Sequence, residues 1–215
     1  MTQTDQRDTP KLMIREETPA DCRAVEEITR EAFWNRYAPG CNEHWLVHLL
    51  RKAPEFQPWH SLVAEYDGHI IGHALLSPAE ILLKDDGVFP VMALGPLTVL
   101  PAVSRRGIGS SLMRCAVQVA KEQGKSALML TGDLDYYHRF GFVSASGFGI
   151  RLADMANDEE AAFFMALPLS PGALDKKQGL FKFAPLFDLG DSPEFEAYDS
   201  GFPKREKLRL PGQLK

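Results

Sequence analysis

Residues 104–110 (SRRGIGS) place a glycine-containing turn between an apolar strand and an amphipathic helix, and this order strongly restricts the possible folds. The first N–H groups of such a helix have no partner within it, and the helix dipole adds positive charge at the same end. Gly107 and Gly109 let the main chain approach a ligand closely, and Arg105 and Arg106 add full positive charge. The segment therefore predicts a phosphate cradle.

The composition narrows the class of protein. A chain of 215 residues, 45% of them hydrophobic, suits one globular domain with an appendage. A net charge of -5 argues against a protein that coats nucleic acid. The three cysteines have no CxxC or metal-type spacing, which favours reduced thiols in a cytoplasmic protein without a metal site. No apolar run approaches the roughly 20 residues of a membrane span, so we expect no membrane partner.

Periodicity and turn signals predict a mixed α/β order of elements. Four helices are expected. One begins at Thr18, which we predict as its N-cap, and a second begins at Asn42. A third runs from the glycine turn to about residue 124, and a fourth covers 134–140. Strands are expected over 11–15, 61–66, 69–76 with a continuation through 81–83, 88–100, 126–130, 142–150 and 161–169.

Gly95-Pro96 interrupts the long strand over 88–100. Proline cannot donate a hydrogen bond to a neighbouring strand, so regular pairing should break there. A bulge at this point would part the strand from its neighbour and open a slot in the sheet.

The two ends of the chain differ from its middle. Residues 1–10 read as a disordered lead, residues 11–170 as the domain, and residues 171–215 as an extension that packs on the domain or is partly disordered. Within the extension, the aromatic segment 179–187 is expected to add a strand or to pack on the core. The basic tail around 204–209 is interpreted as a surface-wrapping or disordered segment, with a dimer arm or a lid as alternatives.

Two segments, 97–113 (LTVLPAVSRRGIGSSLM) and 132–142 (GDLDYYHRFGF), resemble the motifs of the GNAT superfamily of acetyl-CoA-dependent N-acetyltransferases. The first is similar to the CoA-binding motif Q/R-x-x-G-x-G/A, although Ser104 stands where the family has Gln or Arg. The second is similar to a C-terminal signature with a tyrosine four residues ahead of Gly-Phe. The resemblance covers about residues 13–169. It implies an α/β fold with a mixed, mostly antiparallel central sheet flanked by helices, splayed between strands 88–100 and 126–130.

The resemblance also implies a site for acetyl-CoA as cosubstrate. The pantetheine arm would pair with the strand, and the pyrophosphate would sit on the glycine turn. Tyr137 would be the general acid that protonates the leaving sulfur. The implied cofactor-binding residues are Leu97, Thr98, Val99, Arg105, Arg106, Gly107, Ile108, Gly109 and Ser110.

The general base is left open by the sequence. His73 is a candidate because histidine ordinarily titrates near neutrality, and Glu80 and Asp133 are carboxylate alternatives. Each of the three also has an ordinary structural interpretation, and an amine of lowered pKa needs no dedicated base.

The expected function is acetyl transfer from acetyl-CoA to a primary amine by direct attack, because no cysteine lies in either motif to carry the acetyl group. The alternative is a non-catalytic acyl-CoA-binding sensor or interaction module. A nucleotide-binding protein is disfavoured, because the turn lacks the lysine of GxxxxGK[ST]. The acceptor, a small-molecule amine or a protein amino group, and a possible homodimer stay open. The aromatic residues that either line an acceptor pocket or form core are Trp34, Tyr37, Trp45, Phe56 and Trp59.

Overall fold

The computed structural model describes residues 11–153, 161–187, 189 and 192–213. The predicted disordered lead over 1–10 and most of the loop after residue 153 lie outside the described residues. The helices are α1 (Cys22–Phe33), α2 (Glu43–Leu50), α3 (Ile108–Glu122), α4 (Leu134–Tyr137) and α5 (Pro193–Asp199). The strands are β1 (Met13–Glu16), β2 (Ser61–Tyr66), β3 (His69–Leu83), β4 (Val88–Val99), β5 (Ala127–Thr131), β6 (Val143–Ser144), β7 (Ile150–Leu152), β8 (Phe164–Pro168) and β9 (Gly179–Lys182).

The strands form one sheet in the order β1-β2-β3-β4-β5-β8-β6, with β9 pairing with β3 and β7. Neighbours on the main path are antiparallel except β4 and β5, which are joined through α3 and run parallel. A parallel pair needs such a crossover, whereas the hairpin between β2 and β3 needs only the Asp67-Gly68 turn. The predicted mixed, mostly antiparallel sheet is confirmed.

The splay between β4 and β5 is also confirmed. Their pairing is limited to Met92 with Leu128 and Ala93 with Met129, although β4 continues to Val99. Beyond these pairs, Gly95 has φ +147°, which favours glycine, and the register with β3 shifts. The main chain after Ala93 is therefore bonded to β3 on one edge and parted from β5 on the other.

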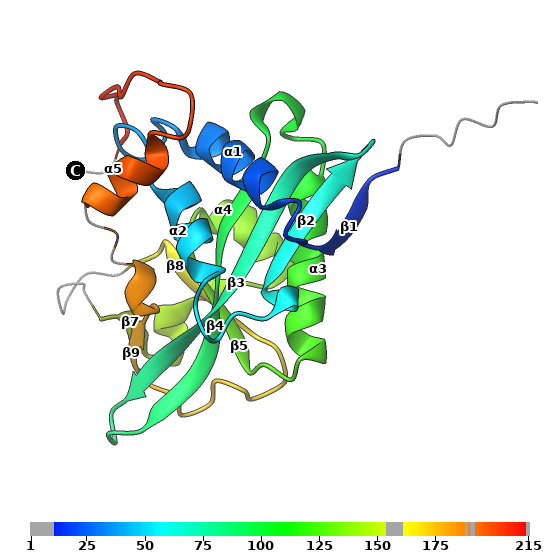
Figure 1. Cartoon of the computed structure of the whole chain (residues 1–215). Coiled ribbons are helices and arrows are strands. Elements are labelled where there is room, and N and C mark those ends of the chain that lie inside the picture. Colours follow the sequence, from blue (N-terminus) through cyan, green and yellow to red (C-terminus); the bar gives the residue numbers. More distant parts are fainter. Residues whose placement is uncertain (1–10, 154–160, 188, 190–191, 214–215) are drawn as a thin grey trace, which may run out of the picture.

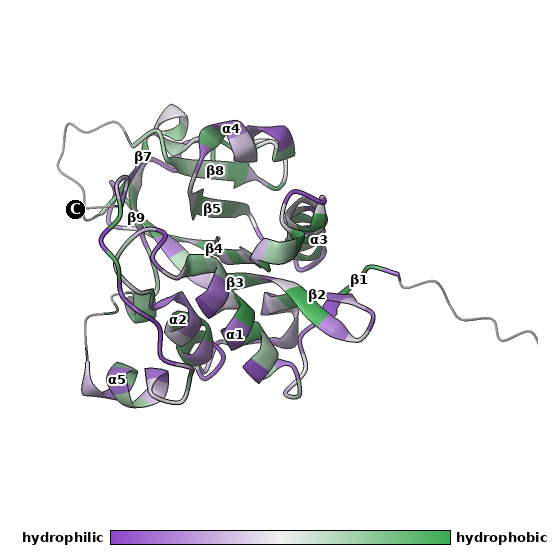
Figure 2. Ribbon diagram, turned by 90° about the horizontal axis from the view of Figure 1, so that it is seen from above, coloured by the Kyte–Doolittle hydropathy of each residue, from purple (hydrophilic) through white to green (hydrophobic). Residues whose placement is uncertain are grey.

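Helices cover the two faces of the twisted sheet (Figure 2). The apolar stripe of α3, with Leu112, Met113 and Ala116 fully buried, packs on one face. Val25 of α1 and Val47 of α2 lie in a separate cluster on the other. Apolar residues at helical spacing explain both contacts, since each helix buries one side and exposes the opposite one.

The prediction of one continuous strand over 142–150 is wrong. The chain forms only the two-residue β6, then a 3₁₀ turn over Ala145–Phe148, and then β7. Gly149 has φ +70°, a left-handed conformation that ends regular pairing. The predicted interruption at Pro78 is absent, because β3 runs unbroken through it, paired with β4 and then with β9.

The described part of the C-terminal extension packs on the domain (orange to red in Figure 1). After β9, helix α5 lies against α1 and α2. The Arg30 guanidinium pairs with the Asp199 carboxylate at 2.8 Å, and His44 contacts the rings of Tyr198 and Phe202. Among the described residues, we find no helix with the length and apolar character needed to cross a membrane.

Candidate active site

The predicted phosphate cradle forms at the start of α3. Gly107 is the N-cap residue and has φ +84°, which disfavours any side chain there. The N–H of Ser111 donates to the Gly107 carbonyl at 3.0 Å, so the N–H groups of Ile108, Gly109 and Ser110 precede the first bond of the helical ladder. A Cβ at Gly107 would point into open space. The turn therefore presents free donors to an open surface, as phosphate binding requires.

Arg105 and Arg106 add charge to the cradle. Both are exposed, and neither forms an ion pair with another described residue. Their guanidinium groups are thus available for a bound phosphate, and either one is a candidate for the side-chain contact that Ser104 does not supply.

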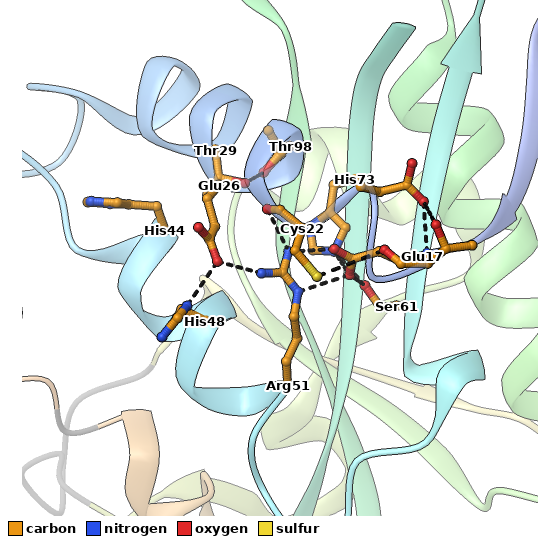
Figure 3. A network of polar contacts seen from close by, with 12 residues as sticks. Glu17, Cys22, Glu26, Thr29, His44, His48, Arg51, Ser61, His73 and Thr98 are labelled. Atoms are coloured by element: carbon orange, nitrogen blue, oxygen red, sulfur yellow. Dashed lines mark hydrogen bonds and ion pairs between the residues drawn. The ribbon is translucent and has the colours of Figure 1, made fainter. Parts of the chain in front are cut away.

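The slot is lined by the end of β4. The side chains of Leu97 and Val99 pack against the core under α3. Thr98 faces the opposite side, fully buried, with its Oγ1 3.2 Å from that of Thr29 in α1 (Figure 3). Of the three predicted slot residues, Thr98 can therefore contact a ligand only through its main chain.

Tyr137 lies at the end of α4, whose N-cap Asp133 accepts a hydrogen bond from the N–H of Asp135 at 3.0 Å. The Tyr137 ring packs edge-on against Phe142, and close against Gly132, where a Cβ would overlap the ring atom Cε2. Burial raises the pKa of Tyr137 to about 12. The hydroxyl is consequently protonated at neutral pH, as a general acid must be.

The cradle and α4 converge. A Cβ at Gly109, in the first turn of α3, would lie 3.0 Å from the Tyr136 hydroxyl and 3.4 Å from Cγ2 of Val99. The glycine thus permits close contact between the cradle, the slot and α4. The ring of Tyr136 lies 4.9 Å from that of Tyr137, so the cradle, the end of β4 and α4 are neighbours.

Two residues of the loop between α1 and α2 affect the electrostatics of Tyr137. Besides burial, which has the largest effect, the charges of Tyr37 and Asp133 raise the pKa of Tyr137 and the charge of Arg36 lowers it. Tyr37 is 42% exposed, and Arg36 is also exposed. We did not identify Arg36 from the sequence, because no local motif marks a loop arginine as part of a site.

His73, the first of the three candidate bases, lies in the interior. It is fully buried on the α1 face of the sheet, and its Nε2 is 2.8 Å from the Ser61 Oγ (Figure 3). Burial lowers the pKa of His73 to about 3. The Ser61 hydroxyl donates its hydrogen to Glu17 and therefore accepts the Nε2–H of His73, which fits a neutral imidazole in a structural network.

That network is centred on Arg51, which joins two buried carboxylates (Figure 3). Its guanidinium pairs with Glu17 and, at 2.7 Å, with Glu26, and Glu26 also lies 3.0 Å from Nδ1 of His48. These contacts tie α1 and α2 to the sheet. They stabilise the helices that carry the α1–α2 loop.

Glu80 and Asp133 differ in their distance from the slot. Glu80 pairs with Pro90 and Lys182, four residues along β3 from Leu76, which pairs with Leu94. This separation is about 13 Å along the strand. Asp133 is exposed at the start of α4, and its carbonyl accepts the N–H of Tyr137 at 3.1 Å. Of the three candidates, the structure brings Asp133 closest to the predicted chemistry.

The predicted aromatic group divides between the loop and the core. Trp34 donates its Nε1–H to the carbonyl of Glu206 at 3.0 Å, and the exposed Tyr37 packs against the ring of Phe33. Trp45 stacks on His48, and the rings of Phe56 and Trp59 pack edge-on against His60. Within the described residues, no group of three His, Cys, Asp or Glu side chains is arranged to hold a metal ion.

Comparison with known proteins points to one family. The Acetyltransferase (GNAT) family matches residues 23–142. YjhQ, an uncharacterized N-acetyltransferase of Escherichia coli K12, is 32% identical over 129 residues, covering 60% of this chain and 67% of YjhQ. YhbS from the same organism, also an uncharacterized N-acetyltransferase, is 26% identical over 177 residues, covering 82% of this chain and 99% of YhbS.

Two similar solved structures contain CoA ligands. A GNAT family acetyltransferase from Brucella melitensis, in complex with acetyl-CoA, has a TM-score of 0.66 and 32% identity, covering 83% of this chain and 99% of that one. The Escherichia coli YhbS structure, in complex with CoA, has a TM-score of 0.73 and 26% identity, covering 84% and 94%.

Proposed function

Because the chain belongs to the GNAT family of acetyltransferases, we propose that it transfers an acetyl group from acetyl-CoA to a primary amine by direct attack in a ternary complex. One observation carries this proposal: the open N–H groups of α3, the splayed end of β4 and the helix that carries Tyr136 and Tyr137 lie beside one another. The CoA ligands of the two similar structures support the assignment of the cosubstrate.

Each part of the cosubstrate has a matching surface. The pyrophosphate accepts hydrogen bonds from the N–H groups at 108–110 and pairs with Arg105 and Arg106. The pantetheine arm lies along the free edge of β4 at Leu97 and Val99, as an added strand would. The thioester then lies where β4 parts from β5, with a main-chain N–H near Val99 as the donor to the carbonyl oxygen.

The transfer forms one bond and breaks another. The neutral amine attacks the thioester carbon, the C–S bond of the resulting intermediate breaks, and the sulfur leaves with a proton from Tyr137. The proton lost by the amine passes to Asp133, the candidate base that lies near Tyr137, and solvent restores the proton of Tyr137.

A covalent acetyl-enzyme is disfavoured by the state of Cys41, a cysteine in the α1–α2 loop. Cys41 Sγ lies 3.6 Å from Nδ1 of His44, whose Nε2 is 3.0 Å from Asp199. This order resembles a nucleophilic triad, but burial raises the pKa of Cys41 to about 12. The thiol therefore stays protonated and is a poor nucleophile.

The three described cysteines are free, which supports a reducing compartment such as the cytoplasm.

The competing function, a non-catalytic acyl-CoA-binding module, predicts the same affinity for acetyl-CoA without turnover. The test is CoA-thiol release across a panel of amines, with the Tyr137→Phe variant and Tyr66→Phe as a control at an exposed tyrosine. We expect release with the wild type and the control, and a kcat lowered about 10²–10⁴-fold in Tyr137→Phe. Acetyl-CoA binding with no release on any amine would favour the binding module.

A further inference from the structure

Tyr136, the residue before Tyr137, reaches from α4 to the first turn of α3. A Cβ at Gly109 would lie 3.0 Å from the Tyr136 hydroxyl and 3.4 Å from Cγ2 of Val99. A Cβ is one bond from its Cα, so the hydroxyl lies beside the main chain of Gly109 and the side chain of Val99. Because α4 follows β5 and α3 follows β4, this contact crosses the splay between the two strands.

The hydroxyl lies where the two parts of the cosubstrate site meet. Gly109 carries one of the N–H groups that precede the helical ladder of α3, and Val99 ends the part of β4 that is parted from β5. A ligand that uses both the cradle and the free edge of β4 therefore passes the hydroxyl. In acetyl-CoA, the pantetheine arm and the pyrophosphate are joined by a phosphate ester, and this ester belongs at the same junction.

The hydroxyl has no hydrogen-bond partner in the part of the chain that the structure describes. The hydrogen bonds that Tyr136 forms use its main chain: its carbonyl accepts the Nε–H of Arg139 at 2.8 Å, and its N–H donates to the Asp133 carbonyl at 3.1 Å. The side chain is only partly buried. A phenol hydroxyl is a hydrogen-bond donor, so this O–H is free to donate to a bound anion.

The ring of Tyr136 is held in place by its neighbours. Tyr137 packs edge-on against it at 4.9 Å, and the ring of Phe140 lies at 5.6 Å. The Arg139 guanidinium covers its face, with Cζ 4.6 Å from the ring centroid. Arg139 is exposed and forms no ion pair with another described residue, so its charge also favours an anion here. A donor fixed before binding loses little entropy when the ligand binds.

We propose that the Tyr136 hydroxyl binds the phosphate that follows the pantetheine arm of acetyl-CoA, so that α4 completes the cosubstrate site from the β5 side of the splay. This inference rests on the proposed acetyltransferase function. The adjacent tyrosines of α4 then have different tasks, since Tyr136 binds a phosphate and Tyr137 acts at the sulfur. Tyr136 determines specificity, because a pantetheine thioester without a phosphate offers its hydroxyl no anion to bind.

The test compares three thioesters: acetyl-CoA, S-acetyl phosphopantetheine, and S-acetylpantetheine, which has no phosphate. Tyr136→Phe removes the hydroxyl and keeps the ring. Calorimetry gives Kd for each ligand, with S-acetylpantetheine measured by its competition with acetyl-CoA. We expect the variant to raise Kd of both phosphorylated thioesters about tenfold or more, the size of one hydrogen bond to a charged group, and to leave that of S-acetylpantetheine within about twofold. Tyr66→Phe, at an exposed tyrosine of β2, should leave all three constants unchanged.

Binding tests this inference, whereas CoA release tests the proposed function. An equal Kd of Tyr136→Phe and the wild type for acetyl-CoA overturns the inference, as does an equal loss of affinity for all three thioesters, and CoA release by the wild type then still upholds the function. A loss of affinity confined to the phosphorylated thioesters upholds the inference. If no amine gives CoA release beside such a loss, the proposed function alone is overturned.

Discussion

Gly132 offers a way to move the Tyr137 ring without touching its hydroxyl. A Cβ at this position would overlap Cε2 of Tyr137 and lie 3.1 Å from Cδ2, whereas ordinary contacts begin at 3.4 Å. Gly132 has no positive φ, so the backbone accepts alanine. The ring must then move by about 1 Å, and a misplacement of this size can lower a rate about a hundredfold. We therefore expect Gly132→Ala to lower kcat about 10–100-fold.

The assay is steady-state CoA release together with calorimetric binding of acetyl-CoA. Gly147→Ala is the matched control, because a Cβ there meets no atom within 4 Å. In the Tyr137→Phe background, Gly132→Ala should change kcat little, since both substitutions act on the same group. A Gly132→Ala variant with the kcat of the wild type would refute the assignment of Tyr137, as would additive effects of the two substitutions.

Three further predictions concern buried titratable groups. As the pH increases, kcat should rise because the amine loses its proton. Because the pKa of Tyr137 is about 12, kcat should then show no fall up to about pH 10. A fall of kcat near pH 9 would contradict this prediction. Arg51→Ala leaves the carboxylates of Glu17 and Glu26, 3% and 8% exposed, without their cation, and should lower the free energy of unfolding in urea by about 3–5 kcal/mol. Burial lowers the pKa of His44 and His60 from 6.5 to about 4 and that of His73 to about 3, so the unfolded chain binds more protons than the folded chain as the pH falls below 6.5. The free energy of unfolding should therefore fall by on the order of 4 kcal/mol per pH unit near pH 5. A free energy of unfolding that stays constant from pH 7 to 5 would contradict the prediction for these three histidines.

The parts of the site with a local cause could be predicted from the sequence. Gly107 and Gly109 after an apolar strand specify the cradle, because its donors are main-chain groups of one short segment. Gly95-Pro96 specifies the splay for the same reason, since proline removes a donor wherever it stands in a strand. Tyr137 was identified instead from the resemblance of eleven residues, 132–142, to a motif of the family. The role proposed for Tyr137 remains a prediction.

Features with a distant cause could not be predicted. The N-cap of α1 is Asp21 and not Thr18, because the Asp21 carboxylate pairs with Arg15 at 2.7 Å and accepts hydrogen bonds from Thr18. The contact between the C-terminal tail and the α1–α2 loop depends on hydrogen bonds between residues more than 170 positions apart, and the local pattern of the tail contains no signal for them.

The most direct test of the account is a calorimetric titration of the full chain with acetyl-CoA, beside the Gly107→Glu variant. Glutamate at this position would require φ +84° and would place a negative charge in front of the α3 donors. The account predicts that the wild type binds acetyl-CoA and that Gly107→Glu weakens binding on the order of a hundredfold or more. Equal dissociation constants, or a wild type that does not bind acetyl-CoA, would contradict it.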